Sequence, residues 1–268
     1  MMKILFLKTF KLLIFVSLWF IPFSLFAQTQ TAKDIEVDLY RSFRKIDSWR
    51  DRQDTLAERD SLQNANDDFA QKLKKYTGEY PITIDEKFGT LVYDHLDIAT
   101  SPDGVFRIYS WDTSLGGSKH AYENVYQYKA GDKTISAIKQ ADSSDEDHPT
   151  YSFSNLSTFK VNDKTYYFGV CNGVYSVRGA AQGLQVFTIE NGKLLDNVKL
   201  IKNSKGLHNR LFYDYEPSSI AHLKVKPSIY FDEASSTIFV PLVNLDGKVT
   251  EKYITYKFNG QYFERVKS

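Results

Sequence analysis

Apolar residues recur at steps of three and four near the start of the chain, which is the period of a helix that buries one stripe. They stand at Ile35, Leu39, Phe43, Ile46 and Trp49, and after Ser61 at Leu62, Phe69, Leu73 and Tyr76. The second series stops at Gly78 and Pro81, residue types that are typical of a helix end. We therefore predict two amphipathic helices, in a helical N-terminal segment over residues 32–80.

A turn, an apolar run and a later tight turn follow one another three times beyond Pro81. The opening turns lie at residues 101–104, 162–163 and 232–236, and the closing turns at residues 130–132, 190–192 and 259–260. Short apolar runs bounded by Asn, Asp and Gly indicate β-hairpins, because these residues tolerate the positive φ of hairpin turns. The expected fold is mainly β: three repeated four-stranded antiparallel, propeller-like sheets in a β-repeat domain over residues 81–268.

The second strand of each predicted sheet is apolar at nearly every position, which indicates cover on both faces. These strands span residues 105–111, 165–171 and 237–243. Pro241 lies inside the last of them and cannot donate to a ladder, so it predicts a bulge or a free edge. Three sheets are fewer than the roughly four to eight blades of a closed propeller. Residues 81–94 are a candidate for part of a further sheet.

In a four-stranded meander, the second turn and the link to the next sheet lie at the same end. Here these connections are long, at residues 112–123, 141–154, 172–183 and 202–224. Long loops on a rigid β scaffold are where binding and catalysis usually occur. We expect all four to project from one face and to form a groove there, since ligand sites are usually concave.

The segment after the first predicted inner strand holds the densest group of candidate binding residues. A tryptophan offers a stacking surface, a histidine titrates near neutrality, and paired glycines let a ligand approach the backbone closely. Across the long-loop face, the predicted ligand-binding residues are Trp111, Asp112, His120, Tyr122, Arg178, Arg210 and Tyr213. We expect Trp111 to be partly exposed in the groove, on the same side as His120 and Arg178. The alternative is that Trp111 anchors the strand end beside a flexible glycine hairpin.

The first 27 residues have the layout of a secretory signal peptide. Three lysines precede an uncharged apolar run over residues 12–26, and Ala27 stands at a plausible cleavage point. The run of 15 residues is shorter than the roughly 20 that span a bilayer, so an uncleaved membrane anchor is the lesser alternative. We expect a mature chain that begins near Gln28, is periplasmic or secreted, and has no membrane span.

Charge and cysteine usage narrow the expected partners. Loss of the three signal lysines leaves 31 of the 34 basic residues against 33 acidic ones, a net charge near −2. Nucleic acid and anionic membrane surfaces are not expected partners without a basic excess. Cys171 is the single cysteine, so we expect no internal disulfide and no lipid anchor near the cleavage site, and we place Cys171 in the core.

The chain carries no linear catalytic signature. G-x-S-x-G, H-E-x-x-H, a phosphate loop and C-x-x-C are all lacking, so we predict no catalytic residue, cofactor or metal site. The acidic stretch at residues 142–147 lacks the ordered spacing of a calcium loop. An enzyme is therefore not the favoured interpretation, although a glycosidase needs only two carboxylates and no linear motif.

The stretch S-P-D-G-V-F-R-I-Y-S-W-D, with G-G-S-K-H and N-V-Y-Q-Y-K after it, resembles exported proteins of unknown function from gut and environmental bacteria. In these proteins a helical N-terminus precedes a β-rich body. The resemblance covers most of the mature chain, and its specific part is residues 101–129. It implies export and a shared fold and carries over no catalytic residue. The third repeat departs from it, because it lacks the glycine and tryptophan of the first.

These observations favour an exported binding module that takes a glycan, a peptide or a partner protein on the long-loop face. One alternative is a glycan-acting hydrolase that uses paired carboxylates. Another is an assembly factor that docks a partner through its N-terminal helices, although the apolar stripes are short for a coiled coil.

Overall fold

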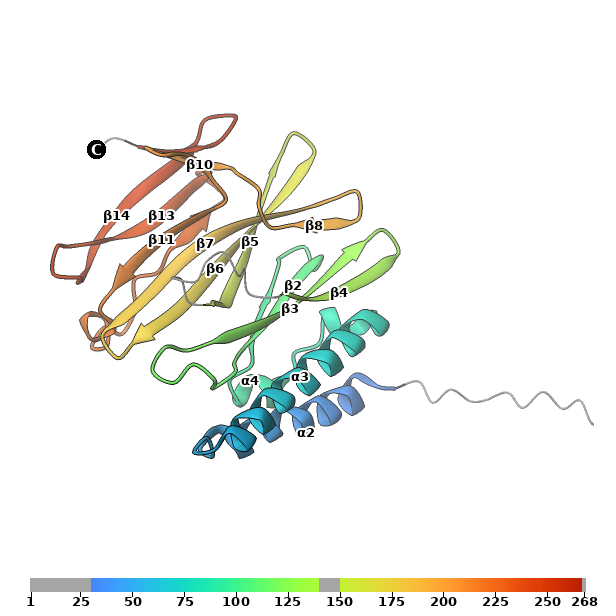
Figure 1. Ribbon diagram of the computed structural model, residues 1–268. Coiled ribbons are helices and arrows are strands. Elements are labelled where there is room, and N and C mark those ends of the chain that lie inside the picture. Colours follow the sequence, from blue (N-terminus) through green and yellow to red (C-terminus); the bar gives the residue numbers. More distant parts are fainter. Residues whose placement is uncertain (1–29, 140–149, 267–268) are drawn as a thin grey trace, which may run out of the picture. The chain divides into compact units, whose positions relative to one another are not determined.

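The computed structural model describes residues 30–139 and 150–266 (Figure 1). The predicted signal peptide at residues 1–27 and the acidic stretch at residues 142–147 lie outside the described residues. Within the described ranges, the α-helices come first along the chain and three β-sheets follow, with the short 3₁₀ helix η2 (Pro217–Ser219) between two of their strands.

The segment with the helical period forms α2 (Ala32–Arg50) and α3 (Leu56–Glu79). Helix α3 starts with a capping box: Thr55 Oγ1 accepts from the Glu58 amide at 3.2 Å, and the Glu58 carboxylate accepts from the Thr55 amide at 3.0 Å. These reciprocal bonds satisfy amides that the first turn of a helix leaves without partners. Among the described residues, no helix has the length and apolar character that crossing a bilayer requires.

Residues 81–94 are largely helical and contribute no strand. They form the 3₁₀ helix η1 (Pro81–Ile84) and the short helix α4 (Gly89–Tyr93). Phe88 and Leu91 are fully buried in the cluster that also holds the apolar stripes of the two long helices. The expectation that this segment adds to a sheet is therefore wrong, because its apolar residues complete a helix-lined core.

The first sheet is a four-stranded meander, as predicted. Its strands are β1 (Asp97–Thr100), β2 (Phe106–Asp112), β3 (Tyr122–Ala130) and β4 (Lys133–Lys139), each antiparallel to the next. The β1–β2 turn places Gly104 at a φ of 64°, which glycine adopts without a steric penalty. Asp103 Oδ1 accepts from the Val105 amide at 3.1 Å, so the Ser-Pro-Asp-Gly sequence fixes this hairpin.

The second sheet has five strands. They are β5 (Ser152–Val161), β6 (Lys164–Ser176), β7 (Gly179–Glu190), β8 (Lys193–Leu195) and β11 (Arg210–Tyr215). With 12 residues, β7 is long enough to pair with β11 along its first half and with β8 near its end. Strand β11 comes from residues that the sequence pattern assigned to a link between sheets.

The third sheet has six strands. They are β9 (Ile201–Asn203), β10 (Gly206–His208), β12 (Tyr230–Asp232), β13 (Thr237–Val243), β14 (Val249–Phe258) and β15 (Phe263–Arg265). The last four form a meander, and β9 adds to β15 in parallel. The prediction of three four-stranded sheets is therefore right for the first sheet only, because the supposed link folds into short strands. A register shift between Pro241 and Val243 agrees with the expectation of a bulge or a free edge at Pro241.

Three apolar clusters connect the helices and the sheets face to face. Helices α2 and α3 share a cluster with one side of the first sheet, and the other side of that sheet packs on the second sheet. The third cluster joins the second sheet to the third. Strand β2 is buried at six of its seven positions, as expected for a strand that is covered on both faces.

Candidate binding site at the ends of the sheets

Hydrogen bonds connect the three sheets near their second turns. The amide of His120, in the β2–β3 connection, donates to the carbonyl of Val174 in β6 at 3.1 Å. The amide of Glu216, directly after β11, donates to the carbonyl of Gly247 in the β13–β14 turn at 2.9 Å. The end of β11 in turn pairs with the start of β7. Connections that are far apart in sequence therefore meet at one end of the sheets.

An open cavity of about 650 Å³ lies between the β6–β7 turn, the end of β11 and the β13–β14 turn. Two aromatic rings, a guanidinium and several carboxylates line it, together with small residues at the start of β7. The lining residues are Tyr175, Arg178, Gly179, Ala180, Asp214, Tyr215, Glu216, Asp246 and Gly247. The volume is within the range of roughly 300–1,000 Å³ that is usual for small-molecule sites.

Tyr175 and Asp214 form a fixed polar pair in the cavity wall. The Tyr175 hydroxyl donates to Asp214 Oδ1 at 2.9 Å. Burial raises the pKa of Tyr175, and the hydrogen bond to Asp214 adds to this shift, so the phenol keeps its proton at neutral pH. The pair thus presents an aromatic ring with a carboxylate beside it, in one defined orientation.

Arg178 is the cation of the cavity. It stands in the tight β6–β7 turn, where its amide donates to Ser176 Oγ at 3.3 Å, and its side chain is exposed. In the part of the chain that the structure describes, its guanidinium takes part in none of the ion pairs. Five donors are therefore available to a ligand, beside the carboxylates of Asp214, Glu216 and Asp246.

Tyr215 lines the cavity, and Tyr213 supports it from the same strand. The two rings lie 5.6 Å apart at an angle of 36°. The Tyr213 hydroxyl donates to Gln182 Oε1 at 2.9 Å, and the same oxygen accepts from the Ile229 amide at 2.7 Å. Tyr213, which the sequence placed in the ligand site, is not a lining residue of the cavity. Gln182 of β7 accepts from both Tyr213 and the β11–β12 link.

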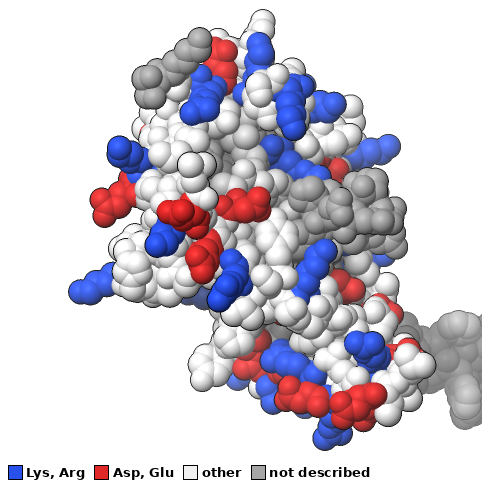
Figure 2. All heavy atoms as spheres, turned by 60° about the vertical axis from the view of Figure 1, so that its left-hand side comes forward, with Lys and Arg blue, Asp and Glu red and all other residues white. Residues whose placement is uncertain are grey.

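Acidic and basic side chains are interspersed on the face that Figure 2 shows. Among the described residues on this face, neither sign forms a continuous field. A mixed surface of this kind gives no electrostatic preference for a polyanion. The cavity shows the same mixture, with Arg178 among acidic neighbours.

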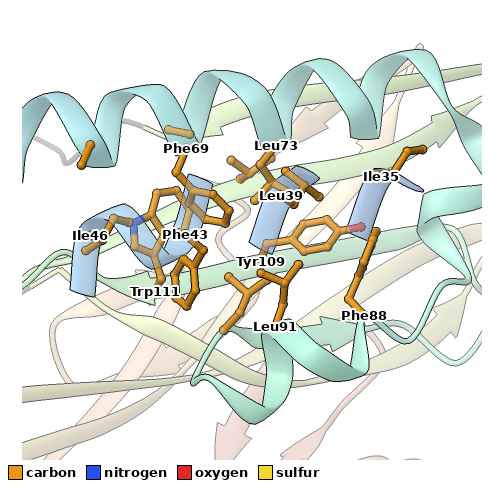
Figure 3. Packing of buried hydrophobic residues seen from close by; sticks show 14 of the residues in the cluster. Ile35, Leu39, Phe43, Ile46, Phe69, Leu73, Phe88, Leu91, Tyr109 and Trp111 are labelled. Carbon is orange, nitrogen blue, oxygen red and sulfur yellow. The ribbon is translucent and has the colours of Figure 1, made fainter. Parts of the chain in front are cut away.

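Trp111 lies in the core, so the expectation that it is partly exposed in a groove is wrong. Its side chain is 1% exposed, its ring packs edge-on against Phe69 at 5.0 Å, and its indole N–H donates to Asn66 Oδ1 at 3.0 Å (Figure 3). Side chains alternate along β2, and Trp111 falls on the side that α3 covers. The alternative interpretation, an anchor at the strand end, describes this tryptophan correctly.

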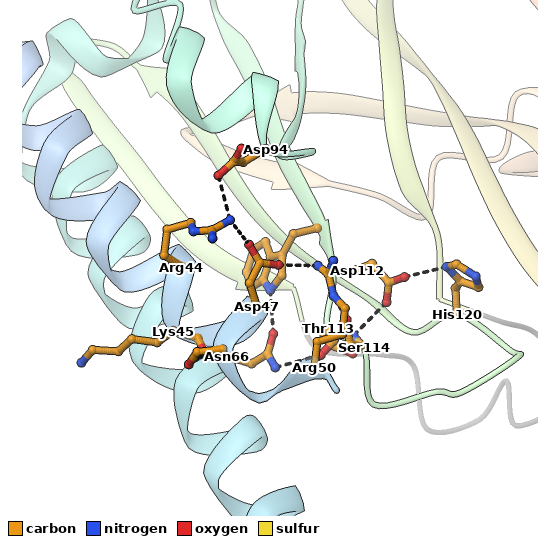
Figure 4. Close-up of polar contacts among 12 residues, drawn as sticks. Arg44, Lys45, Asp47, Arg50, Asn66, Asp94, Asp112, Thr113, Ser114 and His120 are labelled. Carbon is orange, nitrogen blue, oxygen red and sulfur yellow. Dashed lines mark hydrogen bonds and ion pairs between the residues drawn. The ribbon is translucent and has the colours of Figure 1, made fainter. Parts of the chain in front are cut away.

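Asp112, His120 and Tyr122 do come together, but outside the cavity. Asp112 Oδ2 lies 2.6 Å from His120 Nδ1, and Asp112 Oδ1 accepts from the Ser114 amide at 2.8 Å (Figure 4). The His120 ring stacks on Tyr122 at 6.1 Å. These contacts link residues within the β2–β3 connection to one another. Asp112, His120 and Tyr122 therefore stabilise the conformation of this loop.

The helices hold the base of the same loop (Figure 4). Arg50 Nε donates to Ser114 Oγ at 3.1 Å, and Asn66 Nδ2 donates to the Thr113 carbonyl at 3.1 Å. Ser114 has a φ of 61°, which a residue other than glycine adopts only at a cost. Contacts from both helices therefore stabilise a backbone conformation that the loop would not prefer alone.

Arg210 lies at the other end of β11 from the cavity. It pairs with Gln185, whereas Tyr215 pairs with Ala180, and five residues of strand separate Arg210 from Tyr215 by about 16 Å. Its guanidinium lies over the Phe212 ring at 5.7 Å. Of the predicted ligand-binding residues, only Arg178 lines the cavity.

Five functional side chains of the cavity escaped the prediction of ligand-binding residues. They are Tyr175, Asp214, Tyr215, Glu216 and Asp246. The signal for Tyr175 was its place next to the tight turn that carries Arg178. The carboxylates gave no signal of their own, because recognising their shared position requires the pairing of β7 with β11.

Comparison of the chain with protein-family models, with curated proteins and with solved structures finds no match in any of the three.

Proposed function

We propose that the protein is an exported binding module that takes a glycan in the cavity at the ends of the sheets. The observation that carries the proposal is the convergence of Tyr175, Tyr215, Arg178 and three carboxylates from separate connections on one open cavity. The mainly β scaffold below these connections supplies the rigidity that a pre-formed site needs.

Glycan chemistry suits this set of side chains. Tyrosine rings offer flat apolar faces with a polar tip, which match the faces of a sugar ring. Carboxylates accept and a guanidinium donates hydrogen bonds, so Asp214, Glu216 and Arg178 together match a ligand that is rich in hydroxyl groups. A neutral sugar also avoids the repulsion that a strongly charged ligand would meet among side chains of both signs.

A hydrolase is the less favoured function. A general acid in glycoside hydrolysis needs a carboxyl with a raised pKa. Glu123, whose pKa is raised by burial, is not a lining residue of this cavity.

Docking of a partner by the helices is also less favoured. The apolar stripe of α2, which such docking would use, is buried against α3 and the first sheet.

Export rests on the signal-like sequence of residues 1–27. Mass spectrometry of the exported chain tests it: a terminus near Gln28 supports export, and an intact Met1 contradicts it.

The binding proposal is tested by titrating soluble cello-, xylo-, manno- and chito-oligosaccharides into the protein, with melting temperature and calorimetry as readouts. We expect at least one series to bind and Tyr215→Ala to weaken that binding at least tenfold. Tyr230→Ala, which removes an exposed tyrosine of the third sheet, is the matched control and should bind normally. Binding of short peptides but of no oligosaccharide would contradict the glycan assignment.

A further inference from the structure

A second cavity, of about 610 Å³, lies between α3 and the first sheet. Its charged lining comes from Asp67 and Lys74 on α3, from Glu123 on β3, and from Lys139 on β4. It shares no lining residue with the cavity at the ends of the sheets. It also has no part in the glycan proposal.

Glu123 is the unusual group in this cavity. Its Oε2 atom is buried and has no hydrogen-bond partner among the described residues. Burial raises the pKa of Glu123 to about 7, and the nearby Asp67 carboxylate adds to the shift. Buried polar atoms are nearly always hydrogen-bonded, and one without a partner requires an explanation. A donor from a ligand would complete the coordination of this oxygen.

The remaining charges favour a cationic donor near Glu123. Asp67 adds a second negative charge, whereas Lys139 is already paired with Asp196. Lys74 stands seven residues beyond Asp67 on α3, about 10 Å along the helix axis.

We propose that this second cavity binds a small organic cation, a primary amine or a guanidinium, through the carboxylates of Glu123 and Asp67. The ionised form of Glu123 makes the ion pair, so binding is coupled to release of a proton from this carboxyl near neutral pH. Alkyl walls from Leu115 and Ile138 suit a short aliphatic chain behind the charged group.

Isothermal titration calorimetry with agmatine and butylamine at pH 6.5 tests the proposal, with 1-butanol and butyrate as neutral and anionic counterparts. We expect both amines to bind and the counterparts not to bind. In two buffers of different ionisation enthalpy, the measured heats should show release of a fraction of a proton on binding. Glu123→Gln should lower the affinity at least tenfold and abolish the proton release.

Glu264→Gln is the matched control, because it makes the same change at an exposed position of β15. It should leave amine binding unchanged. Asp67→Asn provides a second variant, on an exposed helix position, with an expected loss of about threefold to tenfold in affinity. Failure of both amines to bind, equal binding of butyrate, or unchanged affinity in both Glu123→Gln and Asp67→Asn would overturn the proposal.

Discussion

The helix-covered side of the first sheet and the cavity at the ends of the sheets use similar residue types in opposite ways. On the helix side, Trp111 is 1% exposed and its N–H is bonded to Asn66. At the cavity, Tyr215 is only half-buried and Arg178 is exposed. Aromatic and polar groups that are bonded to each other stabilise the fold, whereas those left open are available to a ligand. The comparison therefore separates residues whose loss should unfold the protein from residues whose loss should only weaken binding.

Trp111→Ala should have the largest effect on stability. Removing a large buried aromatic side chain typically costs about 3–5 kcal/mol, and here it also leaves Asn66 Oδ1 without its donor. We expect a large fall in the urea midpoint of unfolding. Trp111→Phe, which keeps an aromatic ring, should lose clearly less stability than Trp111→Ala. A stability loss below about 1 kcal/mol for Trp111→Ala would contradict its place in the core.

The pH dependence of stability should show a smaller effect from Glu123. Its pKa in the folded protein is about 7, against an ordinary value of 4.5. The folded state therefore holds this proton more tightly, and stability falls as the pH rises from about 4.5 to about 7. The loss should be of order 1 kcal/mol once screening by solvent is allowed for.

Glu123→Gln checks this dependence, because glutamine cannot ionise. The variant should be more stable than the parent at pH 8 and nearly equal to it at pH 4.5, in denaturant titrations at each pH. Glu264→Gln, at an exposed position, should follow the parent at both pH values. Identical pH profiles for Glu123→Gln and the parent would show that the Glu123 carboxyl is not desolvated in the folded protein.

Local patterns in the sequence predicted the elements better than they predicted the site. The period of three and four at Leu39, Phe43 and Ile46 depends only on neighbouring residues, and it corresponds to the buried stripe of α2. The predicted bulge at Pro241 likewise follows from one residue, which has no amide hydrogen to donate. Burial of Trp111 could not be read in this way, because it depends on where α3 crosses the end of β2.

The candidate site was harder to predict because it depends on pairing between distant strands. The sequence suggested that long second turns share a face, and the contact from His120 to Val174 agrees with a shared end of the sheets. The expected long connection at residues 172–183 is wrong, because β6 continues to Ser176 and β7 begins at Gly179, which leaves a tight turn. It gave no means of seeing that β11 pairs with β7, which brings Asp214 and Tyr215 beside the Arg178 turn. Arg210 was also predicted to bind the ligand, yet the same pairing places it at the far end of the strand.

Substitution of Arg178 tests the central claim most directly, since this side chain is exposed and enters no ion pair among the described residues. Calorimetric titration with the tightest-binding oligosaccharide should show a loss of at least about tenfold in affinity for Arg178→Ala, or about 1.4 kcal/mol. The unfolding free energy should change by less than about 0.5 kcal/mol, as is usual for surface positions. Arg265→Ala, at an exposed position of β15, should bind like the parent. Unchanged affinity in Arg178→Ala, or an equal loss in both variants, would contradict the assignment of this cavity as the binding site.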